Sequence, residues 1–134
     1  MAQRAVCASN LRAIWLASVR YASEHEGQFP PNFDVLLAAG SISEGNLVSR
    51  LSRRSPPVRD YAYVRGLTVH DPNDWILAYG NPAWLQGKDS GANVLFLDGQ
   101  IGFLREPRFN QELQRFRAAF EEARGAPPVV IPPN

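Results

Sequence analysis

The segment 92–104, which reads ANVLFLDGQIGFL, restricts the possible folds of this 134-residue chain more than any other part of it. Two apolar runs flank the dipeptide Asp98-Gly99. Asp-Gly is favoured in the tight type I′ turn, because that turn requires positive φ angles at both of its central residues. We therefore predict a β-hairpin over residues 92–104, closed by a type I′ turn at Asp98-Gly99.

Residues 2–25 have the composition of one long helix. The segment contains no glycine and no proline, the two residues that most disfavour a helix interior. Gly27 and the following Phe29-Pro30-Pro31 are expected to end it. One helix face is predicted from a spacing of three to four residues, and it carries Cys7, Leu11, Ile14, Ser18 and Tyr21.

Apolar side chains also extend around the other sides of this helix, at Trp15, Leu16 and Val19. A helix with one buried stripe and one solvent-exposed face does not need so much apolar surface. Two explanations remain open. Either the helix contacts a second body besides its own domain, so that Trp15, Leu16 and Val19 form an assembly interface, or it is fully buried within one domain.

The rest of the chain predicts an α+β fold. We expect strands at 61–64 and 75–79 ahead of the hairpin, and a short helix at 34–39. The prediction is a long N-terminal helix packed on a small antiparallel sheet of about four strands, with a C-terminal helix. That last helix, at 108–124, is predicted from an apolar stripe formed by Phe109, Leu113, Phe116, Phe120 and Ala123.

The length fits one domain. Residues 1–105 are expected to form its head and residues 106–125 a C-terminal helix that belongs to it. Residues 126–134 are rich in proline, so we expect a tail that is extended or disordered.

Residues that carry chemistry are sparse. Cys7 is the single cysteine, which excludes an intramolecular disulfide and a thiolate-rich metal site. His25 and His70 belong to no metal-ligand pair, and His25 suits a helix C-terminus, where a cation is favoured. We therefore expect no catalytic residue, no cofactor and no enzymatic activity. A formal net charge of +1 also lacks the basic excess of a nucleic-acid-binding domain.

Aspartates in or beside the loops are the one candidate ion site. Calcium is bound by oxygen ligands, often from such loops. The spacing is not that of an EF-hand loop, and aspartate is equally common as a turn former. We expect no metal here, although the candidate ligands are Asp71, Asp74, Asp89 and Asp98.

Two segments carry a family resemblance. The first, CASNLRAIWLASVRYASEHEGQFPP (7–31), has a Cys-x-x-Asn-Leu opening, a helical run ending in Tyr, an acidic turn and Gly-x-Phe-Pro. The second, GANVLFLDGQIGFL (91–104), has a small-Asn-Val-Leu-Phe-x-Asp-Gly pattern. In this order they resemble the start of the head domain and the late hairpin of bacterial type IV pilin-like proteins. YAYVRGL (61–67) and DWILAY (74–79) resemble the strands between, so the resemblance covers residues 1 to about 105.

The resemblance implies a non-catalytic structural subunit, a pseudopilin or minor pilin of a type II secretion or type IV pilus-like filament. Members of that family carry a leader that a dedicated peptidase removes, usually with methylation of the new N-terminus. An apolar segment then anchors the subunit in the inner membrane and forms the filament core. That segment is absent here, and AQRAV (2–6) resembles the point just beyond it.

The implied location is therefore the bacterial cell envelope. The head would lie in the periplasm or in an extracytoplasmic filament, anchored through the missing segment. The implied partners are other pilin-like subunits and the secretion or pilus machinery.

The chain departs from the family in two places. Many relatives have a second cysteine before a Pro-Ser ahead of the first strand, where this chain reads LVSRLSRRSPP (47–57), so a paired-thiol role for Cys7 is in doubt. Residues 106–134 match no pattern of the family. The alternative function is a membrane-anchored module that holds a ligand or partner protein in the loop 80–91, with Trp84 and Leu85 as its exposed anchors.

Overall fold

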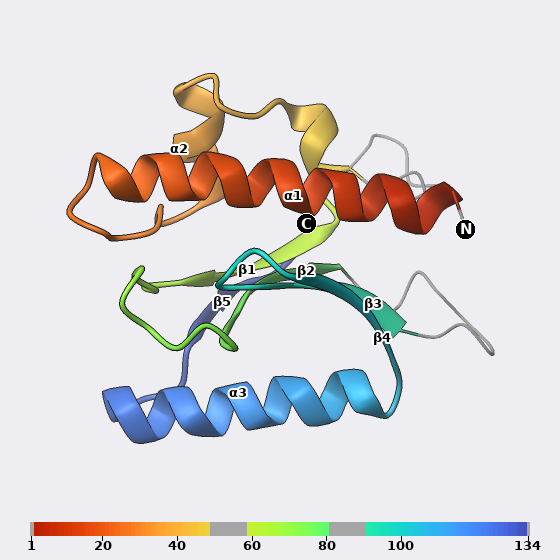
Figure 1. Cartoon of the computed structure of the whole chain (residues 1–134), viewed down its shortest axis with the longest axis vertical. Coiled ribbons are helices and arrows are strands. Elements are labelled where there is room, and N and C mark those ends of the chain that lie inside the picture. The colour runs from red at the N-terminus through yellow and green to blue at the C-terminus, as the bar shows by residue number, and fades with distance from the viewer. Residues whose placement is uncertain (1, 49–58, 81–90, 134) are drawn as a thin grey trace.

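An antiparallel sheet lies between two helical layers in the computed structural model, which describes residues 2–48, 59–80 and 91–133 (Figure 1). The elements in chain order are α1 (Ala2–Ser23), α2 (Phe33–Ala38), the 3-10 helix η1 (Glu44–Leu47), β1 (Tyr61–Arg65), β2 (Ile76–Gly80), β3 (Gly91–Phe96), β4 (Ile101–Arg105), α3 (Arg108–Arg124) and β5 (Val129–Ile131). The sheet has five strands in the order β4-β3-β2-β1-β5. Helix α1 lies on one face, with α2 and η1 beside it, and α3 covers the other face (Figure 1). The predicted α+β fold is confirmed.

The central strand β2 and its neighbour β1 are covered on both faces. Residues 61–64 are buried, and so is every residue of β2. A strand between two helical layers has no side that faces water, so its sequence is continuously apolar instead of alternating. This explains why YAYV and ILAYG lack an alternating pattern.

Helix α1 buries the predicted face against the sheet. Leu11, Ile14 and Ser18 are completely buried and Cys7 nearly so, whereas Tyr21 is half-buried. The helix ends where the Gly27 N–H donates to the Ala22 carbonyl oxygen at 2.8 Å. Gly27 has a φ of 84°, the left-handed conformation that closes many helices.

Helix α3 packs through aromatic side chains. Trp75 lies 5.8 Å from Phe116 and 5.4 Å from Phe120, measured between ring centroids. Tyr79 and Phe109 lie 5.6 Å apart. The predicted stripe is therefore largely the buried face, except that Leu113 is half-buried and Ala123 is exposed.

The turn of the β3–β4 hairpin differs from the predicted type I′. Phe96 N–H donates to the Gln100 carbonyl oxygen at 2.8 Å, and Gly99 N–H donates to the Phe96 carbonyl oxygen at 3.0 Å. Of Asp98 and Gly99, only Gly99 has a positive φ, at 94°. The loop therefore contains three residues, with a type I turn followed by a left-handed glycine. Asp98 instead accepts a hydrogen bond on Oδ1 from the Gln100 N–H at 3.0 Å.

The tail forms a fifth strand, whereas the sequence predicted about four. Residues 129–131 pair antiparallel with β1, in the register Tyr63↔Ile131 and Arg65↔Val129. The expectation of disorder in 126–134 is therefore wrong for these three residues, and the alternative of an extended tail holds. Pro127, Pro128, Pro132 and Pro133 flank the strand, and proline is tolerated at a sheet edge because it needs no ladder hydrogen bond.

Candidate functional site

The Cys-x-x-Asn-Leu opening of the first segment faces inward, toward β1. Asn10 Nδ2 donates to the Tyr61 hydroxyl at 3.0 Å and to the Val48 carbonyl oxygen at 3.1 Å. Leu11 beside it is completely buried. Sequence reasoning gave Asn10 no role, although a polar side chain next to an apolar helix face is a signal for such a bond. These residues fasten α1 to the sheet.

Cys7 shares this buried region. Its side chain is 4% exposed, and its sulfur lies 3.7 Å from the point where a Cβ on Gly80 would stand. Burial raises the pKa of the Cys7 thiol. The same cause raises the pKa of the Tyr61 hydroxyl. A thiol held in its neutral form is a poor nucleophile, so this geometry suits packing better than covalent chemistry.

Trp15, one of the candidates for an assembly interface, makes contacts within the domain and is half-buried. Its Nε1–H donates to the Leu97 carbonyl oxygen at 3.1 Å. Its ring covers the hairpin turn so closely that a Cβ on Gly99 would stand 2.7 Å from it. Trp15 therefore joins α1 to the β3–β4 hairpin, which brings the two family-like segments into direct contact.

Val19 is also half-buried and packs against the core. Besides the sheet, α1 also contacts α2 and η1. Arg59 holds these two elements together, because its guanidinium pairs with Asp34 at 2.6 Å and with Glu44 at 3.1 Å. The Arg59 guanidinium also lowers the pKa of the Asp34 carboxyl.

Leu16 alone of the three predicted interface residues points outward. Its exposed fraction is 57%. Arg12 and Arg20 stand one helical turn before and after it, and both are exposed. Within the described residues neither arginine forms an ion pair. The outer side of α1 is therefore a narrow stripe of Arg12, Leu16 and Arg20, which we call the outer stripe.

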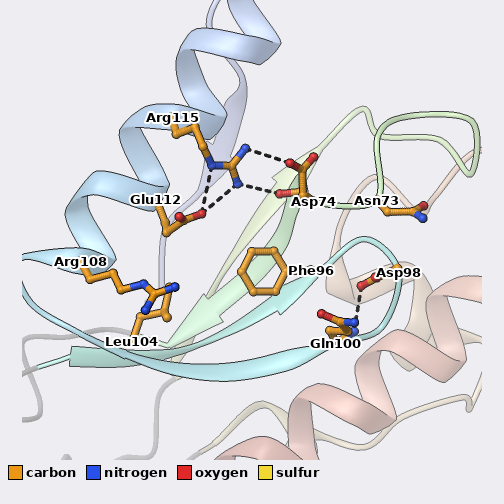
Figure 2. Close-up of a pocket in the computed structure, with 9 residues that line it drawn as sticks. All are labelled: Asn73, Asp74, Phe96, Asp98, Gln100, Leu104, Arg108, Glu112 and Arg115. Carbon is orange, nitrogen blue, oxygen red and sulfur yellow. Dashed lines mark hydrogen bonds and ion pairs between the residues drawn. The ribbon is translucent and has the colours of Figure 1, made fainter.

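A pocket of about 420 Å³ lies between α3 and the β3–β4 hairpin (Figure 2). We call it the hairpin pocket. Figure 2 shows the Phe96 ring between the helix and the turn, with Arg108 and Asp98 on opposite sides of it. Its lining consists of Asn73, Asp74, Phe96, Asp98, Gln100, Leu104, Arg108, Glu112 and Arg115.

The charges of the hairpin pocket largely satisfy one another. The Arg115 guanidinium lies 3.3 Å from the Asp74 carboxylate and 2.9 Å from the Glu112 carboxylate, and it donates to the Asp74 carbonyl oxygen at 2.9 Å. Three carboxylates face two arginines in this pocket. The arrangement braces α3 against the loop before β2, and the pocket has a small excess of negative charge.

The loop aspartates do not gather into an ion site in the described part of the chain. Asp71 accepts two hydrogen bonds from the Arg124 guanidinium, at 2.7 and 2.6 Å, and one from the Thr68 N–H at 2.8 Å. Asp74 pairs with Arg115. Asp89 lies outside the described residues. Across 2–48, 59–80 and 91–133, no three His, Cys, Asp or Glu side chains are placed as metal ligands would be.

The other residues that the sequence singled out are the loop pair Trp84 and Leu85 and the two histidines. Trp84 and Leu85 lie outside the described residues. His25 stacks on Tyr21 with ring centroids 3.7 Å apart, and its Nδ1 lies 2.8 Å from the Tyr21 carbonyl oxygen. His70 is exposed.

Among the helices that the structure describes, none combines the length and the apolar character needed to cross a bilayer. Comparison of the chain with protein-family models, with curated proteins and with solved structures gave no match. The resemblance of residues 7–31 and 91–104 to pilin-like proteins therefore remains a prediction.

Proposed function

We propose that this chain is the head domain of a pilin-like structural subunit, which acts in an envelope filament of the type II secretion or type IV pilus kind. The observation that carries the proposal is the direct contact between the two family-like segments. Trp15 of the first covers the turn of the second, with its indole N–H on the Leu97 carbonyl oxygen at 3.1 Å. Segments that define a family pattern often hold the common fold together, and here the two segments meet at one place.

The direction of α1 also suits such a subunit. Its first turn lies at the edge of the domain, beyond the end of the sheet (Figure 1). A helix that continued in the N-terminal direction would therefore lead away from the head. An apolar anchor in that position would leave the sheet and α3 undisturbed.

The outer stripe is the proposed contact with a neighbouring subunit. Leu16 is the large apolar residue that α1 leaves exposed, whereas Trp15 and Val19 already have partners within the domain. A single exposed leucine is tolerable in a monomer and gains from burial in an assembly. Arg12 and Arg20 would restrict the neighbour to a surface that offers carboxylates or carbonyl oxygens.

Crosslinking of the full-length gene product in its own cell envelope tests this function. We expect a ladder of crosslinked subunits for the wild type, and a much weaker ladder for Leu16→Glu, because a charge would be buried at the contact. Val69→Glu is the matched control, since Val69 is 46% exposed but lies in the turn after β1. An undiminished ladder for Leu16→Glu would exclude the outer stripe as the contact. Absence of any ladder for the wild type would contradict the filament proposal.

A further inference from the structure

A second pocket, of about 510 Å³, opens where the C-terminal ends of α1 and β1 meet the end of α3. We call it the basic pocket. Neither the filament proposal nor the hairpin pocket involves it. It includes the half of the first family-like segment that does not touch the hairpin, Tyr21 to Pro31. The residues that matter for its chemistry are Tyr21, His25, Gln28, Phe29, Arg65 and Arg124.

The walls of the basic pocket are held by backbone hydrogen bonds. Phe29 N–H donates to the Leu67 carbonyl oxygen at 3.0 Å, and Val69 N–H donates to the Gly27 carbonyl oxygen at 2.8 Å. A bridge between Gln28 and Thr68 lies in the middle of this pairing. Residues 27–29 are therefore tied to residues 67–69, just after β1, and the pocket is formed before any ligand arrives.

The side chains of the walls are fixed as well. The Tyr21 and His25 rings stack at an interplanar angle of 4°, and the His25 Nδ1 contact with the Tyr21 carbonyl oxygen holds that stack. The Arg124 guanidinium is anchored by Asp71 and donates to the Gly66 carbonyl oxygen at 3.1 Å. Phe29 is buried and supplies an apolar floor.

The balance of charge sets the basic pocket apart from the hairpin pocket. No aspartate or glutamate is found among its described lining residues. Asp71 neutralises Arg124 from outside the lining. Arg65 is exposed at the end of β1 and has no ion pair within the part of the chain that the structure describes. The pocket therefore presents one uncompensated guanidinium next to a flat aromatic wall.

We infer that the basic pocket binds a small organic carboxylate with a flat apolar body. A guanidinium offers two parallel N–H groups that match a carboxylate, and the Tyr21–His25 stack offers a face for a ring or a planar chain. Tyr21 and Gln28 are polar residues of the lining, and the volume is that of an ordinary small-molecule site. The inference is independent of assembly, because all of these residues belong to one subunit.

The test is a titration of the 134-residue chain with benzoate, followed by amide NMR shifts. We expect saturable shifts at residues 21–31 and 65–68, and none with benzyl alcohol, which keeps the ring and lacks the charge. Arg65→Gln should weaken benzoate binding about tenfold or more, the loss expected for a charge-assisted hydrogen-bonding pair. Arg12→Gln, an exposed arginine of the outer stripe, is the matched control and should bind like the wild type.

Several outcomes would overturn the inference. These are linear, unsaturated shifts with benzoate, equal shifts with benzyl alcohol, shifts centred on the hairpin pocket, and unchanged binding by Arg65→Gln. A titration with inorganic phosphate separates general anion attraction from carboxylate recognition. If phosphate causes shifts as strong as those with benzoate, the pocket recognises negative charge alone, and the inferred preference for a flat carboxylate is wrong. Arg65 is exposed, so circular dichroism should show an unchanged fold for its variant.

Discussion

At the scale of single residues, the contact between Trp15 and Gly99 has the sharpest consequences. A Cβ at Gly99 would meet the Trp15 ring at 2.7 Å, and the glycine φ of 94° is itself unfavourable for other residues. Gly99→Ala should therefore lower the free energy of unfolding by about 2–4 kcal/mol, from backbone strain and overpacking together. Chemical denaturation measures the change.

Gly40→Ala is the matched control for this prediction. Gly40 has a φ of 73°, but no atom lies within 4 Å of the added Cβ. Gly40→Ala should therefore lower the free energy of unfolding by about 1 kcal/mol, from backbone strain alone. In a Trp15→Ala background the extra cost at Gly99 should disappear. Equal losses at Gly40 and Gly99 would show that the indole does not press on the turn.

The thiol of Cys7 should be unreactive in the folded chain. It is 4% exposed, and burial raises its pKa, so the thiolate that reacts is both scarce and covered. We expect a thiol reagent at pH 8 to label native protein at least about a hundredfold more slowly than denatured protein. Rapid labelling without denaturant would place Cys7 at the surface.

Buried tyrosines should weaken the fold in alkaline solution. Burial raises the pKa of Tyr61, Tyr63 and Tyr79. The unfolded chain then loses these protons first as the pH rises above about 10, so the stability is complete below that pH and falls above it. In a Tyr21→Phe background, tyrosinate absorbance at 295 nm should appear together with loss of the circular dichroism of the fold. Ionisation of the three tyrosines in fully folded protein would contradict this.

At the scale of elements, β5 is a small strand with a measurable role. Val130 and Ile131 are half-buried and pack against the core, and β5 covers the edge of β1. Deletion of residues 126–134 should lower the free energy of unfolding by about 2 kcal/mol or more, because apolar area and strand pairing are both lost. Deletion of 132–134 alone should change little. If both deletions behave alike, the strand does not contribute to stability.

The elements that the sequence predicted are those whose signals are local. The hairpin follows from two apolar runs around Asp98-Gly99, and α1 follows from its periodicity and from Gly27. The turn type was missed, because a three-residue and a two-residue loop use the same glycine. β5 was missed because a strand of three residues among prolines is defined by its partner β1, far away in the chain.

The candidate sites could be predicted less well than the elements. Periodicity placed Trp15, Leu16 and Val19 off the sheet-facing side of the helix, but it could not show that α2, η1 and the hairpin turn cover most of that surface. The basic pocket has no sequence signal of its own. Tyr21, Arg65 and Arg124 belong to separate elements, and only the folded chain brings them together.

At the scale of the whole molecule, protection of the backbone amides against hydrogen exchange should decrease from the middle of the sheet outward. β1 and β2 lie between other strands and under helices on both faces, whereas β5 is an edge strand of three residues. Amide hydrogen exchange should be slowest in β1, β2 and β3, and much faster in β5 and η1, which open without global unfolding. Equally slow exchange in β5 would mean that the tail unfolds only with the entire domain.

The pairing of β1 with β5 joins two segments that the ribosome synthesises at different times. Tyr63 and its neighbours emerge from the ribosome well before Ile131, so one edge of the sheet has no native neighbour until residues 129–131 have appeared. During that interval the exposed edge is open to pairing with other chains. A nascent chain therefore gains from protection of this edge, by a chaperone or a translocation channel, until residues 129–131 are released.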